Sequence, residues 1–237
     1  MSPAPLVLTV AGFDPSARAG LLADTWAIAH AGGAPLAVVT ALTAQGPQFV
    51  CVPVAPRLLG QQLRSALASG PVRAVKLGMV PDRGALAQIV RALRPGSRPI
   101  VVDPVVRTSR GERLSALDPA DYRQLAHRLG PRNRVVITPN REELGWLEAS
   151  PAQLLRLGFW GVVVKGSQSA VDEVFGPTGH QVLGGARLPR STSHHRGTGC
   201  RFGSGLATAL ARGEDLVSAT RSAKRLVRRF LRSPIIR

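Results

Sequence analysis

The segment Gly197-Thr198-Gly199-Cys200 contains the residue types in this chain that are best suited to chemistry. An apolar, Ala-rich run over 206–211 follows it and predicts a buried helix. Glycines two residues apart permit a tight turn, and the free N–H groups and dipole of the helix that follows attract an anion. A thiol at a helix N-terminus often has a lowered pKa. An ordinary glycine turn before a core helix is the alternative interpretation.

The elements that would position this turn alternate between strands and helices. Apolar runs predict strands over 5–10, 36–42, 49–52, 74–79, 99–104, 134–138 and 161–166, and helical spacing predicts helices over 21–31, 56–69, 83–93 and 118–129. Apolar strands separated by helices are typical of a parallel sheet covered on both faces. We therefore expect a single α/β domain over 1–237 with three layers, α/β/α, and a mostly parallel central sheet.

Polar residues follow several of these strands. In parallel α/β sheets ligands bind at the carboxyl ends of the strands, and Asp103, Asn140, Glu143 and Lys165 would share that rim. Carboxylate and amide oxygens suit hydrated Mg²⁺, and a lysine beside glycine suits phosphate. A single charged residue at a strand end is also consistent with simple solvation.

The charge balance favours anionic partners. With 31 Lys+Arg against 14 Asp+Glu, the formal net charge is +17, which suits nucleotides, phosphorylated metabolites, nucleic acid or membrane surfaces. Only 4% of residues are aromatic, which argues against a stacking surface for single strands, and we do not expect nucleic acid as the partner.

The N-terminal apolar run over 5–10 is too short for a signal or a membrane span, and no basic leader precedes it. The two cysteines make neither a disulfide framework nor a metal site. We therefore expect a cytoplasmic protein without a membrane partner.

The C-terminal stretch predicts an amphipathic helix. Its cations fall on one face and its apolar side chains on the other. The cations are Arg221, Lys224, Arg225, Arg228, Arg229 and Arg232, and the apolar residues are Ala223, Leu226, Val227 and Phe230. A solvated face over a packed one is the simpler interpretation, and contact with a polyanion or a membrane surface is the alternative.

The chain resembles the hydroxymethylpyrimidine/phosphomethylpyrimidine kinases of thiamine biosynthesis, within the ribokinase-like superfamily. The matching motifs come in the family's order and cover nearly the whole chain. They are 8–14 with 19–24, Thr-Ala-Leu-Thr-Ala-Gln over 40–45, Val-Lys-Leu-Gly-Met over 75–79, Val-Val-Asp-Pro-Val over 101–105, Thr-Pro-Asn-Arg-Glu-Glu over 138–143, Val-Val-Lys-Gly over 163–166 and Gly-Thr-Gly-Cys over 197–200.

The resemblance implies an ATP-dependent kinase that uses Mg²⁺ and phosphorylates the hydroxymethyl group of a pyrimidine and its monophosphate. A vitamin kinase of the pyridoxine type and a catalytically weakened ligand- or polyanion-binding relative are alternatives, and a homodimer is left open.

The same resemblance assigns roles to individual residues. It implies that Gly12, Asp24 and Gln45 face the pyrimidine between Met79 and Val105. It implies that Asp103, Asn140 and Glu143 organise Mg²⁺ and phosphates, with Asp103 and Glu143 nearest the metal, and that Lys165 holds ATP. The turn Gly197, Thr198, Gly199 and Cys200 would be the catalytic anion hole. A helix-surface carboxylate and a turn residue are the plainer interpretations of Asp24 and Gln45.

The chain departs from the family pattern at several places, among them Gly46 where the family usually has asparagine. Ala17 and Arg18 stand where the family usually has two glycines, and Arg196 stands where it has histidine. The segment 144–160 is shorter than the family's and is expected to lose most of a helix. These departures bear on substrate specificity and activity rather than on the fold.

Overall fold

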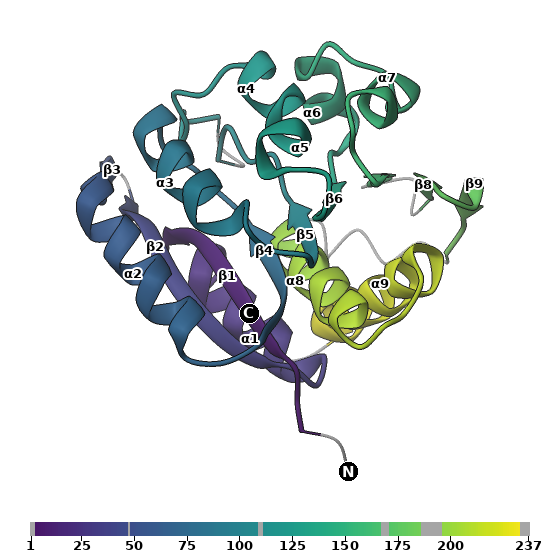
Figure 1. The fold of residues 1–237 in the computed structure, drawn as a ribbon, viewed down its shortest axis with the longest axis horizontal. Helices are drawn as coiled ribbons and strands as arrows, with labels where there is room; N and C mark the ends of the chain where they lie inside the picture. Colours follow the sequence, from purple (N-terminus) through teal and green to yellow (C-terminus); the bar gives the residue numbers. More distant parts are fainter. Residues whose placement is uncertain (1–2, 47, 109–110, 167–170, 186–195, 233–237) are drawn as a thin grey trace.

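The computed structural model describes residues 3–46, 48–108, 111–166, 171–185 and 196–232. Within these residues one nine-stranded sheet has the order β3-β2-β1-β4-β5-β6-β7-β8-β9 (Figure 1). The strands are β1 Leu6–Phe13, β2 Ala34–Gln45, β3 Phe49–Pro53, β4 Val72–Leu77, β5 Pro99–Val102, β6 Arg134–Ile137, β7 Gly161–Val164, β8 Asp172–Gly176 and β9 Gly179–Leu183.

The centre of the sheet is parallel, as the sequence predicts. Strands β2, β1, β4, β5, β6 and β7 run in one direction, so their carboxyl ends meet at one rim. β3 adds antiparallel at one edge, and the β8–β9 hairpin adds antiparallel at the other. The hairpin was not predicted from the sequence, because its second strand is largely exposed and lacks a continuous apolar run.

Helices cover both faces and make the three expected layers (Figure 1). One face carries α2 Pro56–Ala68, α3 Arg83–Leu93, α4 Pro119–Arg123, α5 Leu125–Leu129, α6 Arg141–Trp146 and α7 Pro151–Arg156. The other carries α1 Gly20–His30, α8 Thr198–Ala211 and α9 Leu216–Arg232.

Alternate strand residues fill two separate cores, because successive side chains of a strand point to opposite faces. In β4, Val75 packs with α2 and α3, whereas Ala74 packs under α8. The same alternation holds in β5 for Ile100 and Val101. Lys76 therefore projects into the α1–α8 layer, next to the rim where the candidate site residues lie.

Two helical segments differ from the sequence prediction. The helix expected over 118–129 is divided at Gln124 into α4 and α5. The segment 144–160 contains the end of α6 and the whole of α7, and serine at position 150 begins α7 with a capping box. The segment thus contains short helices, and the loss of most of a helix relative to the family stays a prediction. In the described part of the chain, no helix has the length and apolarity needed to cross a membrane.

Candidate active site

The predicted anion-binding turn lies at the N-terminus of α8, at the carboxyl rim of the sheet. Gly197 is the N-cap and has φ of 76°, a left-handed conformation that favours glycine. A Cβ there would also overlap the carbonyl oxygen of Arg18. The N–H groups of Thr198, Gly199 and Cys200 occupy the first turn, where the helix itself has no carbonyl to accept them. A fourteen-residue helix adds its dipole to these donors.

Lys165 lies between two carboxylates beside this turn. Its Nζ is 2.6 Å from Oδ1 of Asp103 and 3.6 Å from Oε2 of Glu143. A Cβ placed on Gly199 would be 3.4 Å from Lys165 Nζ and 3.5 Å from Asp103 Oδ2. The backbone of the turn therefore lies next to the lysine and Asp103, within van der Waals reach of a single added carbon.

Asn140 fixes the position of Glu143. The amide Oδ1 of Asn140 accepts the N–H of Glu143, and Oε2 of Glu143 accepts the N–H of Asn140, each at 2.8 Å. The Asn-x-x-Glu motif is thus the capping box of α6. Burial raises the pKa of Glu143, the Lys165 ammonium opposes that rise, and the Asp103 carboxylate adds to it.

The predicted acceptor residues gather on the other side of α8. A Cβ on Gly12 would lie 2.6 Å from Cε of Met79 and 3.9 Å from Cγ2 of Thr43. Gln45 Nε2 donates to Thr43 Oγ1 at 3.2 Å, and Arg196 donates to Gln45 Oε1. Val105, two residues beyond Asp103, is partly buried.

Asp24 lies inside a buried network rather than on an open acceptor surface. Its oxygens accept from Lys76 Nζ at 2.8 and 3.0 Å, from Thr9 Oγ1 at 2.7 Å and from Ser204 Oγ at 2.9 Å, and its side chain has no exposed surface. The structure therefore differs from the pyrimidine contact that the resemblance implies for Asp24. Sequence reasoning missed Lys76, although a lysine inside an apolar strand signals a buried cation.

The Cys200 thiol lies between the two groups of residues. It accepts a hydrogen bond from the N–H of Gly20, whose own Cβ position would overlap the carbonyl oxygen of Gly12. Burial raises the pKa of Cys200, and the Lys76 ammonium opposes that rise. The sequence pattern suggests a lowered pKa for a thiol at a helix N-terminus, but here burial outweighs the nearby positive charge.

Arg201 connects the first loop, residues 14–19 between β1 and α1, to the 197–200 turn through hydrogen bonds. Its guanidinium donates to the carbonyl oxygens of Arg18 at 3.0 Å, Gly197 at 3.2 Å and Ala17 at 3.3 Å. It also stacks on Phe230, 3.8 Å from the ring centroid, and the residue is only 2% exposed. No sequence signal marked this residue, because the two first-loop carbonyl oxygens that it binds lie more than 180 positions away.

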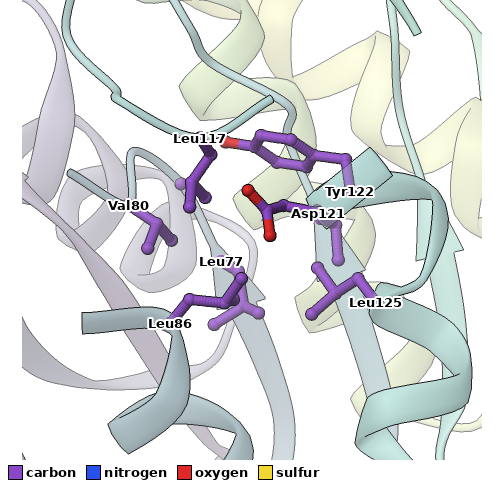
Figure 2. Close-up of a pocket in the computed structure, with 9 residues that line it drawn as sticks. Leu77, Val80, Leu86, Leu117, Asp121, Tyr122 and Leu125 are labelled. Atoms are coloured by element: carbon purple, nitrogen blue, oxygen red, sulfur yellow. The ribbon is translucent and has the colours of Figure 1, made fainter. Parts of the chain in front are cut away.

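Two concavities lie away from this turn. Figure 2 shows Leu77, Val80, Leu86, Leu117, Tyr122 and Leu125 closing on a gap under α3 and α5 that has no room for a water molecule, so it is core packing. A wider one of about 300 Å³ lies between β9 and α9, lined by Val182, Leu183, Gly184, Arg221, Lys224, Arg225 and Arg228. The basic helix face is thus concave here, and Lys224 in it is paired with Asp172 at 2.9 Å.

The site residues predicted from separate motifs therefore meet at one rim. Asp103, Asn140, Glu143 and Lys165 adjoin Gly199 on one side. Gly12, Met79 and Gln45 lie on the other side, where Arg196 and Gly20 connect them to the turn.

Comparison with known proteins agrees with this geometry. The family model described as phosphomethylpyrimidine kinase matches residues 14–236. A hydroxymethylpyrimidine/phosphomethylpyrimidine kinase of Rhizobium meliloti is 32% identical and covers 92% of this chain and 87% of its own length. The thiamine biosynthesis multifunctional protein ThiED of Corynebacterium glutamicum is 33% identical over 97% of this chain, which spans 32% of that longer protein.

Solved structures show the same fold. A crystal structure of the phosphomethylpyrimidine kinase from Clostridium difficile has a TM-score of 0.76 and 26% identity, covering 94% of this chain and 99% of that one. Pyridoxal kinase from Staphylococcus aureus, in complex with pyridoxal, has a TM-score of 0.82 at 24% identity and covers 96% and 87%, a likeness of fold alone. The chain therefore belongs to the phosphomethylpyrimidine kinase family and is a kinase with the ribokinase-like fold.

Proposed function

We propose that this kinase transfers the γ-phosphoryl group of ATP to the hydroxymethyl group of 4-amino-5-hydroxymethyl-2-methylpyrimidine, and to the phosphate of the resulting monophosphate, in thiamine biosynthesis. The observation that carries the proposal is the approach of Gly199 to both Lys165 and Asp103. This approach places the anion-binding N-terminus of α8 next to a cation and a carboxylate, which are the groups that phosphoryl transfer requires. The family match and the named relatives support the same reaction.

On the donor side, Lys165 and the N–H groups of the turn would hold the phosphates of ATP. In the described residues no three acidic, histidine or cysteine side chains converge as a preformed metal cage. Mg²⁺ in kinases is held by one or two carboxylates together with phosphates and water, and the Asp103–Glu143 pair fits that requirement. Asp103 and Glu143 would hold the ion, which neutralises charge on the transferring group.

On the acceptor side, the substrate oxygen attacks the γ-phosphorus while the bond from that phosphorus to the β–γ bridging oxygen breaks, and ADP leaves. The proton of the alcohol acceptor goes to water as the new bond forms. A thiol with a raised pKa is mostly protonated at neutral pH, so the cysteine chiefly orients the acceptor. Because the transition state is loose in most analyses, positioning and charge neutralisation supply most of the catalysis.

Gln45 would read the aminopyrimidine edge, because its amide offers both a donor and an acceptor. The Cε atom of Met79 fills the space beside Gly12, and Met79 and Val105 would form the apolar walls of the ring site. We do not place Asp24 against the pyrimidine. It is fully buried and positions Lys76 through an ion pair beside α8.

Steady-state release of ADP tests the assignment, with the free pyrimidine, its monophosphate and pyridoxine as acceptors. We expect turnover with the pyrimidines and little with pyridoxine. Asp103→Asn should lower kcat by about 100-fold or more, since it removes charge from the donor side. Turnover with pyridoxine alone would assign a vitamin kinase of another specificity. Salt-sensitive binding of nucleic acid without ADP release would assign a polyanion-binding role to the basic α9 face.

We also propose that the chain forms a homodimer in the cytoplasm. Both cysteines are unpaired, which suits a reducing compartment. Leu42, Val50 and Val52 are each about half exposed on the β2–β3 ribbon, where Leu42 pairs with Val52. An apolar strip of this kind is typical of a protein–protein contact.

A further inference from the structure

Both ends of the Gln45 amide have partners within the protein. Arg196 donates to Oε1, and Nε2 donates to Thr43 Oγ1 at 3.2 Å. Arg196 directly precedes the turn, so the same short segment carries the anion-binding N–H groups and this cation. A ligand that takes the position of the guanidinium on Oε1 of Gln45 displaces Arg196 from its acceptor.

A second arginine, Arg18, lies in the neighbouring loop. The backbone of Arg18 lies against Gly197, the residue after Arg196, and the Arg18 side chain is exposed. Arg201 holds that backbone in place through the carbonyl oxygens of Ala17 and Arg18. The acid of this loop, Asp14, is buried, and its Oδ1 accepts both the N–H and the hydroxyl of Ser16. The two loops beside the turn thus contribute two arginines, Arg18 and Arg196, against the one carboxylate of Asp14.

We propose that Arg196 is a specificity-determining residue that makes this kinase prefer the acceptor that already carries a phosphate. This inference rests on the proposed function. When the free pyrimidine alcohol binds to Gln45, the partly buried Arg196 guanidinium loses the Gln45 oxygen as its hydrogen-bond acceptor. The alcohol carries no anion that could replace this acceptor. The monophosphate returns up to two negative charges and three acceptor oxygens, which suit the forked donors of arginine. Arg18 strengthens the same preference from the neighbouring loop.

Isothermal titration of the full chain with each acceptor, without nucleotide, tests the proposal. The wild type should bind the monophosphate about tenfold or more tightly than the free alcohol, the ratio expected for one charge-assisted contact. Arg196→Gln should weaken binding of the monophosphate by about tenfold. It should leave binding of the alcohol unchanged or tighter, because Gln45 is released. The ratio of monophosphate affinity to alcohol affinity should also fall as the salt concentration rises.

Arg64→Gln is the matched control. It removes one positive charge from an exposed position on α2, on the opposite face of the sheet, and should change neither affinity. Arg196→Lys keeps the charge but loses the fork, and should give an intermediate ratio. If Arg196→Gln does not fold, the test uses Arg196→Lys instead. The proposal is overturned if the ratio of monophosphate affinity to alcohol affinity in Arg196→Lys equals that of the wild type.

Equal weakening of both acceptors by Arg196→Gln, or no change in either, would also overturn it. Binding requires no turnover, so this result is separable from the reaction itself. A wild type that binds both acceptors with the expected ratio but releases no ADP would refute the proposed function and leave the role of Arg196 intact.

Discussion

Lys76 and Asp24 form an ion pair in which neither side chain has any exposed surface, with Nζ 2.8 Å from Oδ2. The pair ties β4 to α1, and Ser204 extends it to α8. It therefore lies beside α8, the helix that begins at the proposed anion-binding turn. Burial favours the neutral form of a lysine, but the Asp24 carboxylate outweighs it and raises the pKa of Lys76 above its ordinary value.

Lys76→Met should lower the free energy of unfolding by about 3–5 kcal/mol, because it leaves a buried carboxylate without its cation. Lys76→Met combined with Asp24→Asn should recover part of that loss. Urea denaturation measures both. The matched control is Arg83→Gln at an exposed pair with Asp118, expected to cost about 1 kcal/mol or less. A loss of the same small size for Lys76→Met would contradict the ionic description.

The pH dependence of this pair follows from the sign of the shift. A lysine pKa raised in the folded state stabilises the fold fully below the unfolded value, about 10.4, and that stability is lost as pH rises through the folded value. The free energy of unfolding should be measured from pH 7 to 10 for the wild type and for Lys76→Met/Asp24→Asn. The difference in this free energy between the two proteins should stay constant over the range, because Lys76 stays charged in both states.

The Cys200 thiol should react slowly with alkylating reagents, since burial raises its pKa and only the thiolate attacks. In a Cys51→Ser background, the rate of reaction with iodoacetamide should reach half its maximum above the ordinary thiol value of 9.0. Adding Lys76→Met should move that midpoint higher, because the ammonium favours the thiolate. A midpoint near neutral pH would instead identify Cys200 as an activated base.

Ala17→Gly should stabilise the protein. Ala17 has φ of 56°, and an alanine in the left-handed region carries strain of about 1–2 kcal/mol that glycine avoids. Glycine costs more entropy on folding, so the net gain is about 0.5 kcal/mol. Ala19→Gly, at a residue with φ of −142°, is the control and should not stabilise. The midpoint of chemical denaturation distinguishes the two variants.

Arg201→Lys should loosen the loop that Arg201 holds. Lysine cannot donate to three carbonyl oxygens in a fork or stack flat on Phe230, so we expect a loss of about 1–3 kcal/mol. Faster amide hydrogen exchange over 14–20 should accompany it. Arg212→Lys, at an exposed arginine that bonds one carbonyl oxygen and Glu214, should change little. If the rates of amide hydrogen exchange over 14–20 are the same in Arg201→Lys and the wild type, Arg201 does not position this loop.

Leu42→Glu with Val52→Glu should dissociate a dimer formed through the β2–β3 ribbon, because the charges would be buried against each other across the interface. Sedimentation velocity measures the assembly. Val182→Glu, at an exposed valine on β9, is the control and should leave it intact. A dimer that survives both ribbon substitutions would place the contact elsewhere.

The sequence by itself determined the parallel sheet and the rim where the chemistry lies. Near-continuous apolar strands and intervening helices predict the layers, and the residues after those strands must share an edge. The proximity of Asp103 and Lys165, 62 positions apart, followed from that rule. The capping box of Asn140 and Glu143 is equally local, since its partners are three residues apart.

Tertiary structure alone decided which polar groups face inward. Asp24 has the same local sequence whether it meets a ligand or Lys76, and only the packing of α1 against β4 and α8 buries it. Arg196 and Arg201 likewise gain their roles from partners 151 and 183 positions away. Periodicity specifies which face of an element is apolar, but the partner of a buried charge depends on contacts that form only when the layers close.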